Sequence, residues 1–308
     1  MITILFTHEA CQDHDPGPHH PECPARLAAV LAALEGPDFA ALERRIAPAA
    51  SDAEIARVHP MGHIERILGM VPPAGRMMVD PDTALSSGSR DAVLRAAGAV
   101  VAAVDAVVAG EAENAFCAIR PPGHHAEPSH SMGFCLFNNI AIGAAHARAA
   151  HGLRRVAVVD FDVHHGNGTQ AFFFDDVDYL YCSTHQWPLY PGTGAPQETG
   201  AAGNVVNAVL PPGADGAAFR AVFDAQVIPA LDAFAPDFLM VSAGFDAHEG
   251  DPLAGLRLAT EDYGWATGRL RDAAKRHCGG RLVSALEGGY DLEALADSAA
   301  AHVLALMA

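Results

Sequence analysis

Two aspartates and two histidines lie together in residues 160–165, whose sequence is DFDVHH and which follow the apolar, mostly β-branched residues 156–159. Successive side chains of a strand point to opposite faces, so Asp160, Asp162 and His164 would share a face if the strand continued here. Aspartate oxygen and histidine nitrogen are ordinary zinc ligands, and a catalytic zinc site keeps one position open for water. One D-x-H motif more often belongs to a polar loop, but similar groups elsewhere strengthen the prediction of a metal site.

Titratable or aromatic side chains also follow three other apolar runs. They are His124 and His125 after residues 115–119, Asp246 after residues 238–242, and Tyr290 after residues 282–286. If the runs are parallel strands, their carboxyl ends lie at one edge of a sheet, where ligands bind in such folds. We therefore expect these groups to meet in one metal-dependent active site.

The chemistry of such a site would be hydrolytic. Asp162, His164 and Asp246 could hold a zinc ion, which lowers the pKa of water toward neutrality and polarises a carbonyl group. His124 and His125 could act as general base and acid, because histidine titrates near neutral pH. Each side chain has a structural alternative, in which the histidines bind backbone carbonyls and Asp246 caps a turn.

Tyr290 could donate its hydroxyl to an oxyanion that develops in the transition state. Together these groups would hydrolyse an amide or an ester without a covalent nucleophile, and the sequence contains no G-x-S-x-G motif. Tyr290 could instead be a core aromatic residue. The shared position at strand ends favours the active-site interpretation.

Short apolar strands alternate along the chain with alanine-rich helices. The strands are expected at residues 2–6, 115–119, 156–160, 179–183, 238–242 and 282–286. The helices are expected at residues 90–109, 139–150, 217–234, 260–277 and 292–307. This alternation favours a mostly parallel central sheet with helices on both faces. We predict one α/β domain over residues 1–308, because no linker or repeat interrupts the pattern.

The composition is that of a globular protein: 308 residues, 50% hydrophobic and 18% charged, with a net charge of -18. The acidic charge disfavours a nucleic-acid partner and would attract a cationic substrate, although acidity also serves solubility alone. Residues 96–109 are too short to span a membrane, and residues 1–6 do not resemble a signal peptide. We expect a soluble, cytoplasmic protein with no membrane partner. The six cysteines form no C-x-x-C pair, which argues against a zinc ribbon or a redox dithiol.

Several motifs resemble those of the zinc-dependent histone deacetylase family, which has the arginase–deacetylase fold. They are residues 120–126, 133–135, 160–169, 242–252 and 287–291, with His20-Pro21-Glu22, Arg26 and residues 191–194 as further matches. Class II members are the most similar, because of the Arg-Pro-Pro-Gly-His-His sequence, Asn167 and Glu287. The resemblance points to the bacterial histone deacetylase-like amidohydrolase and acetylpolyamine amidohydrolase group.

The resemblance implies two cations. It makes Asp162, His164 and Asp246 the ligands of one catalytic zinc ion. It also implies a structural potassium ion. Its ligands would be the side chains of Asp160 and Ser183 and the backbone carbonyls of Asp162, His164 and Thr184.

The resemblance also implies catalytic roles. His125 would be the general base and acid, oriented by Asn167, and His124 would be its electrostatic partner, hydrogen-bonded to Asp160. Such partners fix the tautomer and the ring direction of a histidine. Tyr290 would stabilise the transition state. Some class II members carry histidine at this position and act slowly on acetyl-lysine, so Tyr290 predicts an active enzyme.

A narrow channel for an acyl-lysine stem is implied by Phe134 and Tyr190, its aromatic walls, and by Gly133. The family usually has phenylalanine at both wall positions, so the Tyr190 hydroxyl could alter the acyl preference. Asp82 would hold the substrate backbone at the rim. Arg26 is a candidate for an inner path of acetate release.

Two substrate classes are compatible with these motifs: an acylated lysine of a protein or peptide, and an acetylated small amine such as an acetylpolyamine. Polyamine-selective relatives carry an acidic gatekeeper after Gly-Asp-Pro, where this chain has Leu253, so acyl-lysine is favoured. Tyr290 argues against a catalytically silent acyl-lysine binder, and His248 against a two-metal ureohydrolase. Zinc is expected from the ligand types, although iron(II) and cobalt(II) accept the same set. The sequence does not indicate which oligomeric state the protein adopts.

Overall fold

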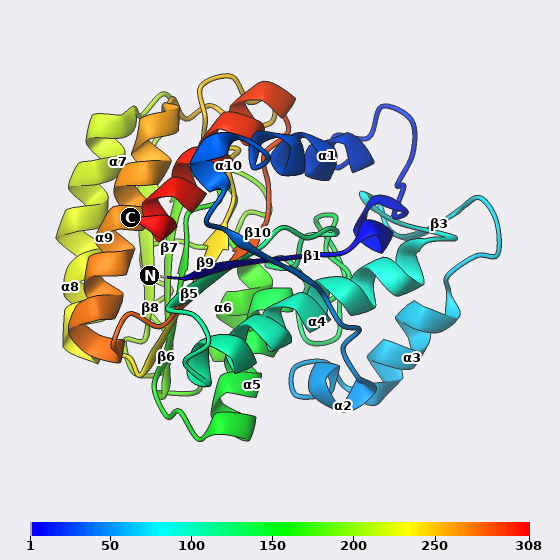
Figure 1. Ribbon diagram of the computed structural model, residues 1–308, viewed down its shortest axis with the longest axis horizontal. Coiled ribbons are helices and arrows are strands. Elements are labelled where there is room, and N and C mark those ends of the chain that lie inside the picture. The colour runs from blue at the N-terminus through cyan, green and yellow to red at the C-terminus, as the bar shows by residue number, and fades with distance from the viewer. Residues whose placement is uncertain (1) are drawn as a thin grey trace.

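A parallel sheet forms the centre of the computed structural model, which describes residues 2–308 (Figure 1). Within these residues the sheet has 8 strands in the order β2-β1-β5-β10-β9-β6-β7-β8. Its strands are β1 (Thr3–Thr7), β2 (Glu43–Ile46), β5 (Asn114–Cys117), β6 (Val156–Asp160), β7 (Tyr179–Gln186), β8 (Val205–Leu210), β9 (Phe238–Ala243) and β10 (Leu282–Leu286). The strands β3 (Arg76–Asp80) and β4 (Thr83–Ser86) form a separate antiparallel hairpin.

Helices cover both faces of the sheet, with α4 and α5 on one face and α7 to α10 on the other (Figure 1). The helices are α1 (Pro24–Ala33), α2 (Asp52–Ile55), α3 (Met61–Gly69), α4 (Ser89–Val108), α5 (Asn139–His151), α6 (Asn167–Phe173), α7 (Gly216–Val222), α8 (Ile228–Phe234), α9 (Thr260–Cys278) and α10 (Leu292–Met307). One π-helical turn, Phe223–Val227, joins α7 to α8. Within residues 2–308, no helix is both long and apolar enough to cross a membrane.

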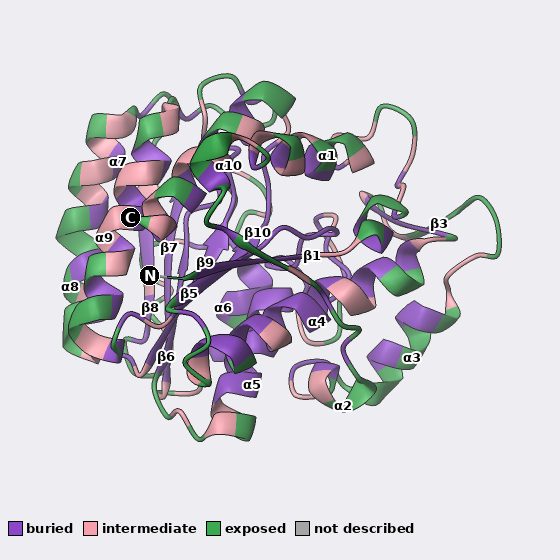
Figure 2. Cartoon of the chain, in the orientation of Figure 1, coloured by how far each residue is buried: buried purple, intermediate pink, exposed green. Residues whose placement is uncertain are grey.

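The central strands are enclosed, as Figure 2 shows by the buried colour of the sheet. Every residue of β5, β6, β7, β9 and β10 is buried. Strands buried on both faces read as continuous apolar runs, which is why the sequence pattern indicates them. The carboxyl ends of these strands therefore emerge from a well-packed core.

Helix caps define the segments next to these strand ends. The side chain of Asn138 accepts the N–H of Ala141 at the start of α5, and that of Asp291 accepts the N–H of Ala294 at the start of α10. Helix α5 ends at Gly152, in the left-handed region. Asp291 follows Tyr290 directly, so this cap fixes the chain just beyond a predicted active-site residue.

The structure confirms the predicted parallel sheet with helices on both faces. The predicted ranges 156–160 and 282–286 are β6 and β10, and the helix predicted at 217–234 is α7 and α8 with their π-helical turn. The sequence pattern does not indicate β2 or β8. Strand β2 is an exposed edge of charged residues, and Asn207 interrupts the apolar run of β8.

Glu22 lies between two buried arginines, Arg26 and Arg120. Its Oε1 accepts from Nη1 of Arg26 at 3.0 Å and its Oε2 from Nη2 of Arg120 at 2.7 Å. All three side chains are fully buried. Burial opposes the ionisation of Glu22, but the charges of Arg120 and Arg26 outweigh it and lower the pKa of Glu22 to about 2. The cluster joins the segment before α1 to the segment after β5.

Candidate active site

Asp162, His164 and Asp246 converge beyond the carboxyl ends of β6 and β9. Nδ1 of His164 lies 3.1 Å from Oδ1 of Asp162 and 3.0 Å from Oδ2 of Asp246. All three side chains are buried. The alternation argument for this cluster is wrong, because β6 ends at Asp160 and the next residues form an irregular segment. The predicted metal ligands nevertheless meet.

Backbone N–H groups hold the two carboxylates in place. The N–H of Gly288 donates to Oδ2 of Asp162 at 2.8 Å, and the N–H of Val163 donates to Oδ1 of Asp246 at 2.8 Å. A Cβ atom at Gly288 would overlap both carboxylates, so glycine leaves the space that they occupy. The site is thus a compact cradle of two aspartate oxygens and one histidine nitrogen, which suits a small divalent cation.

The cradle concentrates charge in a buried place. Burial and the charge of Asp162 raise the pKa of Asp246 to about 7. Burial opposes protonation of His164, but Asp246 and Asp162 outweigh it and raise its pKa to about 10. Two carboxylates this close repel each other, and a cation between them relieves that repulsion.

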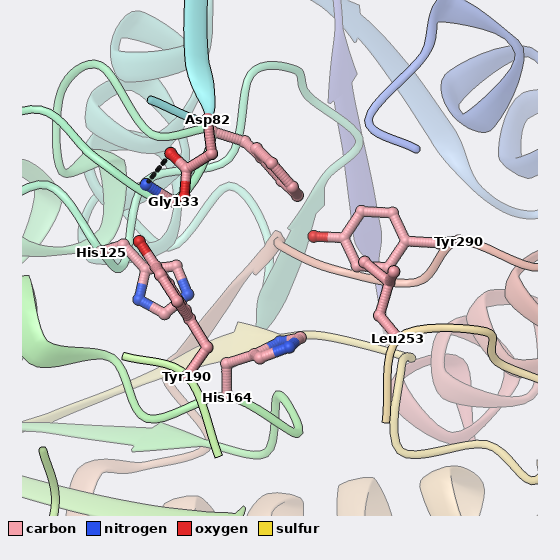
Figure 3. Close-up of a pocket in the computed structure, with 8 residues that line it drawn as sticks. Asp82, His125, Gly133, His164, Tyr190, Leu253 and Tyr290 are labelled. Carbon is pink, nitrogen blue, oxygen red and sulfur yellow. Dashed lines mark hydrogen bonds between the residues drawn. The ribbon is translucent and has the colours of Figure 1, made fainter. Parts of the chain in front are cut away.

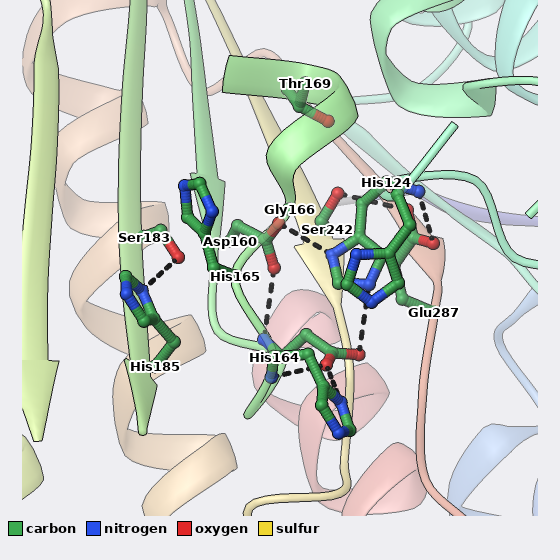
Figure 4. Close-up of polar contacts among 12 residues, drawn as sticks. His124, Asp160, His164, His165, Gly166, Thr169, Ser183, His185, Ser242 and Glu287 are labelled. Carbon is green, nitrogen blue, oxygen red and sulfur yellow. Dashed lines mark hydrogen bonds and ion pairs between the residues drawn. The ribbon is translucent and has the colours of Figure 1, made fainter. Parts of the chain in front are cut away.

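The tandem histidines sit in different electrostatic environments, and Figure 4 shows that of His124. Nδ1 of His124 lies 3.0 Å from Oδ2 of Asp160, and the charges of Asp160 and Asp162 outweigh burial and raise the pKa of His124 to about 10. Nδ1 of His125 donates to Oδ1 of Asn167 at 2.8 Å, which leaves the lone pair on Nε2. Burial and the charge of His124 hold the pKa of His125 well below its usual value. His124 is therefore the charged member of the pair and His125 the neutral one.

A pocket of about 220 Å³ opens beside His164 of the cluster (Figure 3). It is lined by Asp82, His125, Gly133, Phe134, His164, Tyr190, Leu253 and Tyr290. His125 and Tyr190 lie on one side, with ring centroids 5.2 Å apart, and Tyr290 and Leu253 lie on the other. The structure thus brings together all five residues predicted to bind substrate.

Asp82 lies at the rim of the pocket and contacts neighbouring residues there. Its Oδ1 accepts the N–H of Gly133 at 3.0 Å. Burial and the charge of Asp82 raise the pKa of Tyr190. Gly133 has a φ of 59°, and a Cβ there would overlap the His125 ring. Both the conformation and the close approach require glycine.

Arg26 packs against the ring of Tyr290 and binds the backbone beside it. The guanidinium lies 4.9 Å from the centroid of the Tyr290 ring, and it donates to the carbonyls of Gly289 at 2.5 Å and Glu287 at 2.6 Å. Burial raises the pKa of Tyr290 well above its usual value, although Arg26 opposes this. The hydroxyl therefore keeps its proton at neutral pH and can serve as a donor.

Comparison with known protein families matches residues 20–306 to the histone deacetylase domain. The chain belongs to the histone deacetylase family. It is 41% identical to histone deacetylase 14, chloroplastic, of Arabidopsis thaliana, over 94% of this chain and 73% of that protein. It is 40% identical to a histone deacetylase-like amidohydrolase of Pseudomonas aeruginosa, over 94% of this chain and 81% of that protein.

Solved structures of the family agree with the fold. The structure of the HDA15 HD domain matches with a TM-score of 0.93 and 35% sequence identity, over 99% of this chain and 89% of that chain. A probable deacetylase of Archaeoglobus fulgidus is 40% identical over 100% of this chain and 87% of that protein. This member of the histone deacetylase family is therefore a hydrolytic enzyme of the deacetylase and amidohydrolase type.

The side chains that the resemblance assigns to a potassium site, those of Asp160 and Ser183, are fully buried. Asp160 and Ser183 are neighbours across the β6–β7 pairing. Oδ2 of Asp160 accepts the Tyr181 hydroxyl at 2.9 Å, and its Oδ1 accepts the N–H of Asp162 at 3.1 Å. Oγ of Ser183 lies 2.9 Å from Nδ1 of His185 (Figure 4). Tyr181 is a contact of Asp160 that the sequence pattern does not indicate.

Glu287 is a buried carboxylate whose role the sequence does not reveal. Its Oε2 accepts the N–H groups of Gly123 at 2.6 Å and His124 at 3.1 Å, and its Oε1 accepts the Ser242 hydroxyl at 3.1 Å. It therefore anchors the tandem histidines to the ends of β9 and β10. The sequence signal for it is only its position before two glycines at a strand end.

One other group of metal-ligand residues occurs in the described part of the chain, formed by Asp105, His146 and His151. Oδ1 of Asp105 lies 2.6 Å from Nε2 of each histidine. Arg57 donates to Nδ1 of His146 at 2.6 Å, so Nε2 of His146 carries the proton and donates to Asp105. This cluster is satisfied without a cation, and it joins α4 to α5.

Proposed function

We propose that the protein hydrolyses the amide bond of an acylated lysine in a protein or peptide. The observation that carries the proposal is the convergence of three features on one pocket (Figure 3). His164 of the cradle lines it, neutral His125 lies on one side, and the Tyr290 hydroxyl lies on the other. A protein that only binds acyl-lysine would need neither a general base nor an oxyanion donor.

Zinc is the metal that we propose for the cradle. Asp162, His164 and Asp246 would hold it, because their donor atoms and the space beside Gly288 fit a small divalent cation. When bound there, zinc makes a water molecule more acidic and polarises the acyl carbonyl. We also propose that Asp160 and Ser183 contribute to a separate potassium site near the zinc site.

His125 is the group that moves protons. Its Nε2 is unprotonated and faces the pocket, so it can take a proton from the attacking water and return it to the departing amine. Asn167 maintains this tautomer by accepting from Nδ1. His124 is already protonated beside Asp160, so it provides positive charge near the reacting groups and does not act as a base.

Tyr290 stabilises the negative charge that develops on the acyl oxygen. Its hydroxyl keeps its proton because burial raises its pKa. A donor fixed in place before the reaction is more effective than water, because it need not reorient as the charge forms. Tyr290 and His125 thus act from opposite sides of the pocket.

The walls suit the apolar stem of a lysine side chain, which runs between Phe134 and Tyr190. An acetylpolyamine has a similar stem but carries further ammonium groups. At the rim this chain offers the apolar Leu253, which cannot pair with such a group, and this favours acyl-lysine. Acetylpolyamine is the second candidate, because the Asp82 carboxylate and the net charge of -18 attract cations.

Turnover of two substrates tests the proposal. Purified protein of measured metal content is given an acetyl-lysine peptide or an acetylated polyamine, each with and without a hydroxamate chelator. We expect cleavage of the peptide that hydroxamate abolishes. Preference for the polyamine would make acetylpolyamine hydrolysis the function. Failure to cleave either substrate with zinc bound would favour the catalytically silent binder.

The metal ligands can be tested by metal content alone. We expect Asp246→Asn to weaken metal binding by more than about 100-fold, since even the partners of metal ligands contribute 10- to 100-fold. The measurement is zinc per protein after dialysis against a weak chelator. Asp105→Asn, in the cluster of α4 and α5, is the matched control and should keep the wild-type zinc content. Stoichiometric zinc in Asp246→Asn would remove Asp246 from the site.

A further inference from the structure

Asp251 is a buried carboxylate in the irregular segment between β9 and α9, and it has no assigned role. It is 8% exposed. Its Oδ2 accepts the N–H of Tyr290 at 2.7 Å, and its Oδ1 accepts the N–H of Leu253 at 2.9 Å. Each oxygen therefore binds the backbone of a different residue that lines the pocket.

The two residues that Asp251 binds lie on the same side of the pocket (Figure 3). Tyr290 carries the hydroxyl that faces the reacting group, and Leu253 forms the adjacent rim. The backbone before Tyr290 turns through Gly289, whose φ of 120° is in a region that only glycine adopts readily. A turn of this kind is held by its surroundings rather than by its own preference.

Different residues bind the backbone on the two sides of this turn. Arg26 binds the carbonyls of Glu287 and Gly289, so it fixes the chain before Tyr290. The N–H of Tyr290 itself donates to Asp251. Arg26 also packs against the Tyr290 ring, but Asp251 is the group that binds the backbone N–H of Tyr290.

We propose that Asp251 is the positioning residue of Tyr290, and that it couples the oxyanion donor to the rim at Leu253. This inference rests on the proposed function of Tyr290. A carboxylate is suited to the task because both of its oxygens accept, and each receives one N–H. Asparagine can satisfy only one of the two, because its amide nitrogen would face the other N–H as a second donor.

The test is a double-mutant cycle of Asp251→Asn and Tyr290→Phe, measured as kcat and KM on a cleaved substrate. Asp251→Asn alone should lower kcat on the order of 10- to 100-fold, because a small displacement of a catalytic group has effects of this size. In the Tyr290→Phe background the same change should lower kcat less than about 3-fold, since the hydroxyl that it positions is gone. Equal effects of Asp251→Asn in both backgrounds would overturn the inference.

Asp262→Asn is the control, because Asp262 is also buried and accepts a backbone N–H, that of Ala259, but does not line the pocket. Asp262 also pairs with Arg220, so the control removes at least as much local stabilisation. It should leave kcat unchanged. Amide hydrogen exchange supplies a second measurement: Asp251→Asn should speed exchange at Leu253 and Tyr290 while exchange in α5 stays at the wild-type rate. Unchanged exchange at both residues would also contradict the inference.

Two other outcomes are distinguishable from these. If Asp251→Asn does not fold, Asp251→Ser, whose hydroxyl can accept only one N–H, takes its place in the cycle with the same expected result. If the wild-type protein cleaves no acylated amine, the proposed function fails, and the exchange measurement alone then decides whether Asp251 holds the Tyr290 backbone.

Discussion

Tyr290→Phe should lower kcat on the order of 10²- to 10³-fold, the effect of removing one oxyanion donor from a preorganised site. The change deletes a single hydroxyl and keeps the ring that packs against Phe134 and Arg26. The backbone N–H that Asp251 accepts is also unchanged. We therefore expect the zinc content and the urea midpoint to match the wild type while turnover collapses.

The matched control is Tyr179→Phe, which removes a hydroxyl at the start of β7 from a ring that also packs against an arginine, Arg148, and does not line the pocket. It should leave kcat within about 3-fold of the wild type, because it alters no interaction made in the transition state. If Tyr290→Phe kept full activity, Tyr290 would have no part in the reaction. If it lost zinc, its effect on turnover would not report an oxyanion donor.

Glu22→Gln should lower the free energy of unfolding by about 3–5 kcal/mol, the usual cost of removing one partner from a buried ion pair. The substitution preserves shape but leaves the charges of Arg26 and Arg120 uncompensated in a fully buried place. Urea unfolding followed by circular dichroism measures the change. Glu111→Gln, in the exposed pair of Glu111 with Arg45, is the control and should change stability by less than about 1 kcal/mol.

The same variant has a signature in its dependence on pH. The pKa of Glu22 in the folded protein is about 2, below the ordinary value of 4.5. A lowered pKa means that the ionised carboxylate stabilises the fold above about pH 4.5 and that this contribution is lost as the pH falls toward 2. The stability difference between wild type and Glu22→Gln should therefore shrink over that range. A difference that does not vary with pH would show that charge is not the cause.

Much of the fold follows from local pattern. Strands β6 and β10 are buried on both faces, so they appear as uninterrupted apolar runs, and the polar residues after them mark the edge where the site lies. Residues 156–160 and 282–286 could be predicted for that reason. Strand β2 could not, because an exposed edge strand needs no apolar pattern.

The sequence indicates the chemistry of the site but not the hydrogen bonds that hold its residues in place. Asp162, His164 and Asp246 have metal-ligand side chains and follow apolar runs, and these two features together indicate them. What places them is the N–H of Gly288 and the N–H of Val163, rather than strand alternation. Asp251 binds the N–H of Tyr290, and Glu287 binds those of Gly123 and His124. These contacts join residues distant in the sequence, and no local pattern encodes them.

The strand order also constrains how the enzyme can be made. Strand β10 lies between β5 and β9, so it is the piece that joins β2-β1-β5 to β9-β6-β7-β8. During synthesis these two half-sheets cannot close on each other until residues 282–286 have left the ribosome. Each half exposes an unpaired, apolar inner edge until then, and such edges invite pairing with other chains. Nascent chains that stop before β10 should therefore depend on chaperones and should have no hydrolytic activity.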